Sequence, residues 1–87
     1  MIDFDPAKDA ANIAKHGISL ARAVDMNILV TVPDLRRDYR ESRYLAFGEI
    51  DGVMYCLAFA DRNRRVRAIS LRRSRKREYT RYVPKAL

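Results

Sequence analysis

The stretch that decides the fold is RYLAFGEIDGVMYCLAFADRNRRVRAISLR, residues 43–72. Turn residues divide it into three apolar-rich segments: Asp51-Gly52 is a strong two-residue hairpin signal, and Asp61–Arg64 is a polar turn. We therefore predict three consecutive antiparallel strands, over Arg43–Ile50, Val53–Ala60 and Arg65–Arg72. The second segment is almost continuously apolar, which is typical of a central strand covered on both faces.

Helix signals stand at the N-terminal side of this stretch. Asp5-Pro6 predicts a helix start, because Asp caps free N–H groups and Pro fits the first helical position. Gly17 supplies a left-handed stop, preceded by the basic pair Lys15 and His16 in the last turn. The apolar residues of this helix fall on one face at helical spacing: Ala10, Ile13 and Ala14.

Three further elements complete the prediction. Ser19 can cap a second, short helix, whose core-facing residues would be Leu20, Ala23 and Val24. The β-branched run Ile28–Val32 predicts a short strand. Ser74 can cap a last helix with an apolar stripe of Tyr79, Tyr82 and Val83.

These elements predict an α+β layer fold in a single domain, residues 1–87. The expected order is two N-terminal helices, a three- or four-stranded antiparallel meander and a C-terminal helix. The sequence shows no repeat and no linker.

Positive charge is concentrated in the second part of the chain. Residues 1–35 carry three bases and five acids, whereas residues 36–87 carry fifteen bases and six acids, which gives the net charge of +7. The segment Arg62–Arg77 holds nine Lys or Arg residues and no acid. Such clustering lowers folded stability by self-repulsion, so we expect a polyanionic ligand, with nucleic acid first, although a solvated basic face is the alternative.

Other classes of function are disfavoured by composition. The single cysteine, Cys56, lies in an apolar segment and is interpreted as a small buried hydrophobe. One His and one Cys far apart do not supply zinc ligands, so we expect no metal and no other cofactor. The opening Met1–Asp5 lacks a signal-peptide pattern and no apolar run approaches about 20 residues, so we expect a cytoplasmic protein.

The strand Arg65–Arg72 mixes arginine with apolar residues on both faces. Simple alternation puts Val66, Ala68, Ser70 and Arg72 on one face and Arg65, Arg67, Ile69 and Leu71 on the other. A buried strand whose arginines emerge in a cleft would satisfy the pattern, and so would a β-bulge. The sequence does not choose between them.

Three segments together resemble the BrnT toxins. Phe4–Ser19 (FDPAKDAANIAKHGIS) is similar to the family's opening WDPxKxxxNxxKHGVSF, and Asp38–Tyr44 (DYRESRY) to its DYxExRY segment. Arg67–Arg72 (RAISLR), followed by Lys76-Arg77-Glu78 and Tyr82, resembles its RIISxR…KRExxxY signature. Two departures are Phe4 in place of the family's Trp and a short stretch before Asp38.

The resemblance implies a RelE-like fold and a ribonuclease toxin of a type II toxin–antitoxin pair. Such toxins cleave RNA without metal, inhibit translation and are held inactive by an antitoxin, which would here be BrnA-like and would cover the basic face. A non-catalytic nucleic-acid-binding module and an inactive toxin-like partner are the alternatives.

Metal-free RNA cleavage needs a base for the 2′-hydroxyl, charge stabilisation on the phosphorane and an acid for the leaving oxygen. We assign Arg67 and Arg72 to the phosphorane, with a hydrogen bond from Ser70. The alternatives are that Arg72 is a surface arginine next to a helix start and that Arg67 is a strand-edge arginine paired with Asp61 or Glu49. The acid–base candidates are His16, Glu41, Lys15 and Tyr82. His16 can instead be a plain helix cap, phosphate binding is the favoured role of Lys15, and pairing with Arg40 or Arg43 is the favoured role of Glu41.

RNA binding is assigned to cations and aromatic side chains near this strand. Tyr39 is the best residue for stacking on a base, and Tyr82 is either an RNA contact or part of the core. The cations assigned to phosphate contacts are Lys15, Arg43, Arg62, Arg73, Arg75, Lys76 and Arg77.

Overall fold

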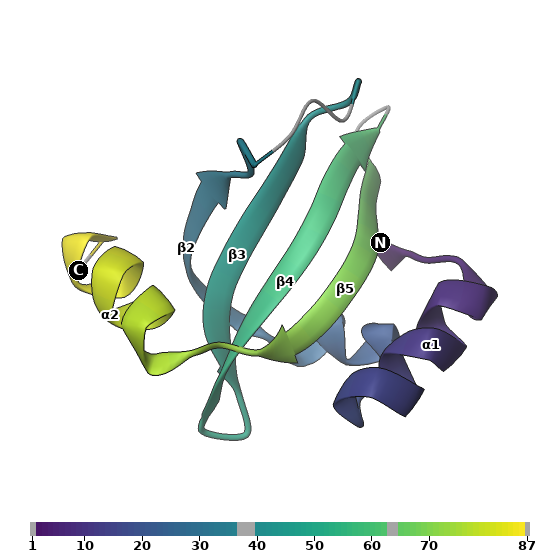
Figure 1. The fold of residues 1–87 in the computed structure, drawn as a ribbon, viewed down its shortest axis with the longest axis horizontal. Helices are drawn as coiled ribbons and strands as arrows, with labels where there is room; N and C mark the ends of the chain where they lie inside the picture. Colours follow the sequence, from purple (N-terminus) through teal and green to yellow (C-terminus); the bar gives the residue numbers. More distant parts are fainter. Residues whose placement is uncertain (1, 37–39, 63–64, 87) are drawn as a thin grey trace.

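The structure, a computed structural model, describes residues 2–36, 40–62 and 65–86; the side chains of Arg62 and of residues 84–86 lie outside this description. Five strands form one sheet in the order β1-β5-β4-β3-β2 (Figure 1). β1 runs parallel to β5 and the other neighbours are antiparallel. The elements are β1 (Ile2–Asp3), α1 (Pro6–His16), the 3-10 helix η1 (Leu20–Asp25), β2 (Asn27–Pro33), β3 (Arg43–Ile50), β4 (Val53–Arg62), β5 (Arg65–Arg73) and α2 (Lys76–Ala86).

The predicted fold class was wrong in two respects. The sheet is mixed and five-stranded rather than a three- or four-stranded antiparallel meander, and the N-terminal region holds one α-helix followed by a 3-10 helix. β1 was missed because a two-residue strand has no periodicity; it forms by tertiary pairing, with Ile2 beside Val66 and Asp3 beside Arg67. η1 is capped by Ser19 as expected, but it spans only six residues and stays in the tighter 3-10 form.

The predicted strands and the hairpin between β3 and β4 are confirmed. Asp51 and Gly52 have φ angles of 51° and 78°, the positive values that a two-residue turn of type I′ requires at both positions. Val24, which we expected to face the core, is instead exposed, while Leu20 and Ala23 are buried.

Helix α1 packs with its polar side inward. Asp5 accepts a hydrogen bond from the Ala7 N–H at 2.9 Å, and Gly17 ends the helix at φ 73°. Asn12 is the buried residue of this helix, and its side-chain amide pairs with the N–H and C=O of Leu71 at 3.0 and 2.8 Å. Asn12 thereby binds the backbone of β5 at Leu71 as a residue of a neighbouring strand would. The face of α1 that carries Ala10, Ile13 and Ala14 is exposed to solvent.

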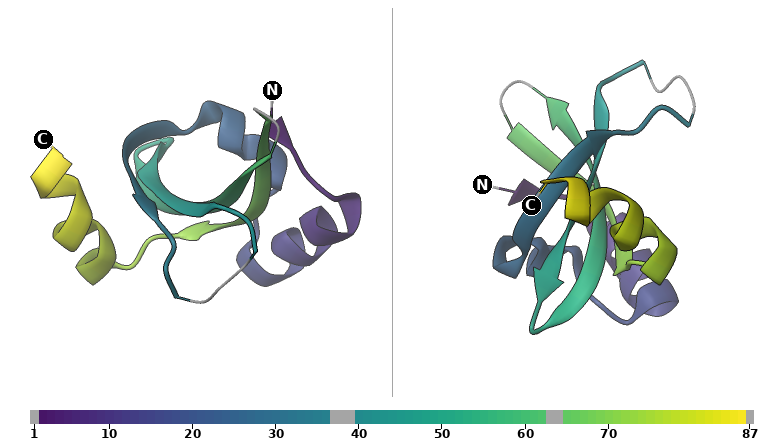
Figure 2. Two further views of the ribbon diagram at one scale, coloured as in Figure 1. Left: turned by 90° about the horizontal axis from the view of Figure 1, so that it is seen from above. Right: turned by 90° about the vertical axis from the view of Figure 1, so that its left-hand side faces the viewer.

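Two separate apolar clusters lie on opposite faces of the sheet. Since side chains alternate across each strand, Ala46 and Leu57 belong to one cluster and Phe47 and Cys56 to the other. η1 covers the first cluster, through Ile18, Leu20 and Ala23. α2 covers the second, through Tyr79, Tyr82 and Val83. Helices α1 and α2 consequently lie at opposite ends of the molecule (Figure 2).

The close pairing of β2 with β3 depends on Gly48. A Cβ atom at this position would lie 2.2 Å from the Asn27 carbonyl oxygen and 2.8 Å from the Ile28 Cα. The register of β2 against β3 shifts between Ile28 and Val30, beside this contact. Only glycine allows the two backbones to approach so closely.

In the described part of the chain, no helix is long and apolar enough to cross a membrane.

Candidate nucleic-acid interface

A β-bulge in β5 brings the predicted catalytic residues of this strand onto one face. Ser70 pairs with Ala58, whereas Ala68 pairs with Phe59, so Ile69 is an extra residue opposite the β4 strand. The extra residue reverses the alternation. Arg67 now lies on the same face as Ser70 and Arg72, the face opposite Leu71, and the bulge resolves the choice that alternation left open.

This face of the sheet is polar along β5 and has small residues in its centre. Residues of neighbouring strands form three rows across it: Arg43, Ala60 and Arg67; Leu45, Ala58 and Ser70; Phe47, Cys56 and Arg72. We call it the arginine face, defined by Arg43, Arg67, Ser70 and Arg72. The rows of Arg67 and Arg72 are about 13 Å apart along the strand, since each row advances by two residues.

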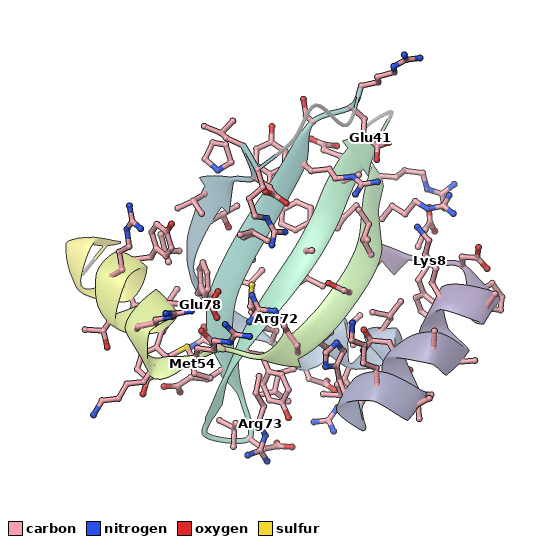
Figure 3. The ribbon with its side chains drawn as sticks, in the orientation of Figure 1. Lys8, Glu41, Met54, Arg72, Arg73 and Glu78 are labelled. Atoms are coloured by element: carbon pink, nitrogen blue, oxygen red, sulfur yellow. The ribbon has the colours of Figure 1, made fainter. Side chains whose placement is uncertain are left out.

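Arg72 is held by Glu78 of α2. Its guanidinium donates two hydrogen bonds to the Glu78 carboxylate, at 2.8 and 2.9 Å, and the two labelled side chains face each other in Figure 3. The carboxylate also accepts the Arg75 N–H at 2.9 Å, and so caps the start of α2. The hydrogen bond from Arg72 lowers the pKa of Glu78 to about 2, and the same contact raises the pKa of Arg72. Both groups are therefore charged at neutral pH.

Cys56 lies beside Arg72 in the third row and is 2% exposed, as expected for a small buried hydrophobe. Burial raises the pKa of its thiol to about 11 despite the positive charge of Arg72. The thiol is neutral at physiological pH and is a poor nucleophile.

Glu41 and Arg43 mark the other end of the arginine face. The Arg43 guanidinium lies 3.0 Å from the Glu41 carboxylate, and both side chains are largely buried, so Glu41 makes the pair that we favoured for it. Figure 3 places Glu41 at the end of the strands distant from Arg72. At the start of β5, the Arg65 guanidinium lies 3.0 Å from the carboxylate of Asp3 in β1.

His16 is the last residue of α1 and lies close enough to Arg72 for the charge of that guanidinium to affect its pKa. Partial desolvation, and then the positive charges of Lys15 and Arg72, lower its pKa below the ordinary value of 6.5. His16 is thus mainly neutral at physiological pH, the form in which an imidazole accepts a proton. His16 and Glu41 lie toward opposite ends of the face.

The remaining predicted contacts fall into three groups. Arg75, Lys76 and Arg77 are exposed at the start of α2, and Lys15 is exposed at the end of α1. Arg73 pairs with Tyr55 on the opposite face of the sheet, so the structure does not bring it together with Arg72. Tyr39 and the side chain of Arg62 lie outside the described residues.

Helix α2 and the strands β2 and β3 enclose a cleft of about 680 Å³ next to Arg72. Tyr82 lies in its wall with its ring stacked on Phe47, at a centroid distance of 5.2 Å and an interplanar angle of 22°. The Arg81 guanidinium lies 5.4 Å from the centre of the Tyr82 ring. The cleft is lined by Val32, Pro33, Asp34, Leu35, Arg36, Leu45, Phe47, Arg77, Glu78, Arg81 and Tyr82.

Glu78, Arg81 and Arg36 also belong to the site and were not predicted from the sequence. Glu78 was part of the signature that resembles the BrnT toxins, but nothing in the sequence showed that it pairs with Arg72. Arg81 follows the basic segment and looked like an ordinary surface residue of α2. Arg36 holds Asp34 through two hydrogen bonds of 2.8 Å, a contact that turn patterns do not reveal.

The fold and this site define a small, strongly basic α+β protein that presents Arg43, Arg67 and Arg72 on one sheet face, a type suited to anionic, phosphate-containing ligands. The family model of the ribonuclease toxin BrnT, of a type II toxin–antitoxin system, matches residues 4–78. The chain therefore belongs to the BrnT family, which confirms the resemblance found in the sequence.

Family membership gives the broad function. The chain is a ribonuclease toxin of a type II toxin–antitoxin system, with RNA as its target and an antitoxin as its partner. Neither the curated proteins nor the solved structures gave a match. Among the described residues, no group of three or more His, Cys, Asp or Glu side chains is arranged to hold a metal ion.

Proposed function

We propose that this protein is a metal-independent endoribonuclease that cleaves RNA by attack of the substrate's own 2′-hydroxyl. One observation carries the proposal beyond family membership: the bulge at Ile69 aligns Arg67, Ser70 and Arg72 on one face. Arg67 has no carboxylate partner among the described residues, unlike its neighbours Arg65 and Arg72. An uncompensated guanidinium on this face favours a phosphate ligand.

In the proposed reaction the 2′-oxygen forms a bond to phosphorus as its proton passes to a general base. The bond from phosphorus to the 5′-oxygen then breaks, and an acid supplies a proton to the leaving oxygen. The products are a 2′,3′-cyclic phosphate and a 5′-hydroxyl. Negative charge builds on the non-bridging oxygens in the transition state, where guanidinium groups bind more strongly than in the ground state.

The arginines divide this work. Arg67 is free to bind a phosphate directly, whereas Arg72 must share its charge with Glu78 and is the more rigidly held of the two. Because their rows are about 13 Å apart, the two side chains reach the same phosphate only by converging over Ser70. The Ser70 hydroxyl lies in the row between them and donates a hydrogen bond to the phosphate.

His16 is the proposed base at the Arg72 end, and Glu41 serves the Arg67 end only if the substrate displaces its contact with Arg43. Lys15, Arg43, Arg75, Lys76 and Arg77 are proposed to contact phosphates, together with Arg62 and Arg73. Tyr39 is proposed to stack on a base.

Cleavage of messenger RNA in the cytoplasm would inhibit translation until the antitoxin binds. We propose that a BrnA-like antitoxin covers the arginine face with an acidic segment and excludes RNA directly. Binding of RNA should then weaken steeply with salt, with a slope of about −0.7 per phosphate contact for single strands. An RNA affinity that does not change with salt concentration would show that the arginines are not part of the contact surface.

The test is incubation of the purified protein with ribosome-free RNA in excess EDTA. Wild type should cleave and Arg67→Ala should not, with an almost unchanged melting temperature. Arg22→Ala is the matched control, because Arg22 pairs with Asp25 and Asp51 away from the arginine face. This variant should cleave RNA as well as wild type.

Other results would redirect the proposal. An active Arg67→Ala protein would sink the catalytic assignment. Salt-sensitive binding without cleavage would favour a ribosome-dependent enzyme or a non-catalytic module, and neither binding nor cleavage would favour an inactive toxin-like partner. Cleavage that EDTA stops would refute the metal-free mechanism.

A further inference from the structure

We propose that the cleft beneath α2 binds one unstacked nucleotide of the RNA, with its base against the aromatic wall and its phosphate at the arginine rim. The inference rests on the proposed ribonuclease function and adds a substrate-binding site to it. It predicts that the protein takes its substrate as a single strand, because a base within a duplex cannot enter a cleft.

The first argument is the shape and chemistry of the wall. Tyr82 and Phe47 form a stacked pair, and the planar Arg81 guanidinium lies over the Tyr82 ring. The Tyr82 ring thus contacts both the Phe47 ring and the Arg81 guanidinium. Arg81 is exposed, so a planar base can take its place or lie under it. Stacking on tyrosine and arginine is the usual way in which proteins hold splayed RNA bases.

The second argument is charge. Two carboxylates face the cleft, and each is already held by two hydrogen bonds from an arginine: Asp34 by Arg36 and Glu78 by Arg72. Within the described part of the chain, Arg77 and Arg81 have no ion pair with a carboxylate. The cleft therefore combines an apolar wall with uncompensated positive charge at its rim, and this combination fits an anionic ligand that has a flat apolar part.

The third argument is continuity with the arginine face. Phe47 and Arg72 belong to the same row, two strands apart, which corresponds to about 10 Å. Glu78 lines the cleft and also holds Arg72. A nucleotide whose base lies on the aromatic wall would thus place an adjoining phosphate beside Arg72.

The experiment combines base removal with removal of the aromatic wall. The probes are fluorescein-labelled RNA oligonucleotides with 2′-O-methyl sugars, which cannot be cleaved, either intact or with one abasic residue at each position in turn. Affinities are measured by fluorescence anisotropy. In wild type, removal of the base at one position should weaken binding by about 5- to 150-fold, the range for one base stacked on an aromatic residue.

The variant Tyr82→Leu should erase this difference, so that intact and abasic RNA bind within about 3-fold of each other. Tyr79→Leu is the matched control: Tyr79 also lies on α2 and packs in the same apolar cluster, but does not line the cleft. This control should keep the full abasic penalty. Arg81→Ala is a second test variant on an exposed residue, and it should reduce the penalty without affecting the fold.

An abasic penalty that is the same in wild type, Tyr82→Leu and Arg81→Ala would overturn the inference while leaving the ribonuclease proposal intact. Arg81→Ala that weakens only antitoxin binding would also overturn it, and would assign the cleft to a protein segment. If wild type bound neither intact nor abasic RNA, the proposed function itself would fail.

Discussion

Replacing Glu78 by Gln should destabilise the protein in a pH-dependent way. The Glu78 carboxylate accepts two hydrogen bonds from Arg72 and one from the Arg75 N–H, so it ties β5 to the first turn of α2. Glutamine keeps the size of the side chain but has no charge and offers only one acceptor oxygen. The bidentate contact is therefore lost.

The magnitude follows from the pKa of Glu78, which the fold lowers from 4.5 to about 2. At about 1.4 kcal/mol per pKa unit, the ceiling is about 3 kcal/mol. Because 23% of the side chain is exposed, solvent screens the interaction, and we expect about 1–2 kcal/mol. A lowered folded-state pKa stabilises the protein fully above pH 4.5. The contribution is lost as pH falls toward 2, with roughly half of it gone by pH 3.

Urea denaturation of wild type and Glu78→Gln at several pH values between 6 and 3 measures this difference in unfolding free energy. It should be about 1–2 kcal/mol at pH 6 and should shrink at pH 3. Glu49→Gln, at an exposed position on β3, is the control and should show little difference at any pH. Equal differences at pH 6 and pH 3 would refute the reasoning, because the carboxylate charge would then not be the source of the effect.

Three further predictions address other parts of the structure. Gly48→Ala should lower the free energy of unfolding by about 1–3 kcal/mol, because its Cβ would collide with the Asn27 carbonyl; an unchanged urea midpoint would contradict this contact. Asn12→Ala should lower the free energy of unfolding by about 2–3 kcal/mol and speed hydrogen exchange of the Leu71 amide, which loses the Asn12 side-chain oxygen as its acceptor; normal protection of this amide would contradict the prediction. If His16 is the base, the acid limb of the pH–rate profile should have its inflection below 6.5, and an inflection above 6.5 would exclude this role.

Much of the fold could be predicted because its strands carry local signals. The apolar runs and the Asp51-Gly52 turn define β3 and β4 without reference to the rest of the chain. β1 could not be predicted, because two residues carry no periodic pattern and their strand is defined only by its pairing with β5. The inner side of α1 could not be predicted either: Asn12 is buried for its hydrogen bonds to the backbone of Leu71, and hydropathy gives no weight to such bonds.

The candidate site was predictable in its residue types but not in its geometry. Arg67, Ser70 and Arg72 were identified from the sequence, yet only the bulge at Ile69 places them on one face. The bulge itself has no glycine or proline to announce it. The contact between Arg72 and Glu78 depends on the packing of α2 against Phe47 and Cys56 of the sheet, which is a tertiary feature.

The distribution of ion pairs separates the arginines that serve the fold from those left for a ligand. Three described acids near the arginine face bind arginines: Asp3 pairs with Arg65, Glu41 with Arg43 and Glu78 with Arg72. These pairs offset the repulsion of a dense positive cluster at three points around Arg67, which keeps its full charge. Arg77 and Arg81 at the cleft also have no ion pair with a carboxylate among the described residues, but they lie on α2. Arg67 is the unpaired arginine that shares a sheet face with Ser70 and Arg72, so it is the position at which we expect phosphate to bind first.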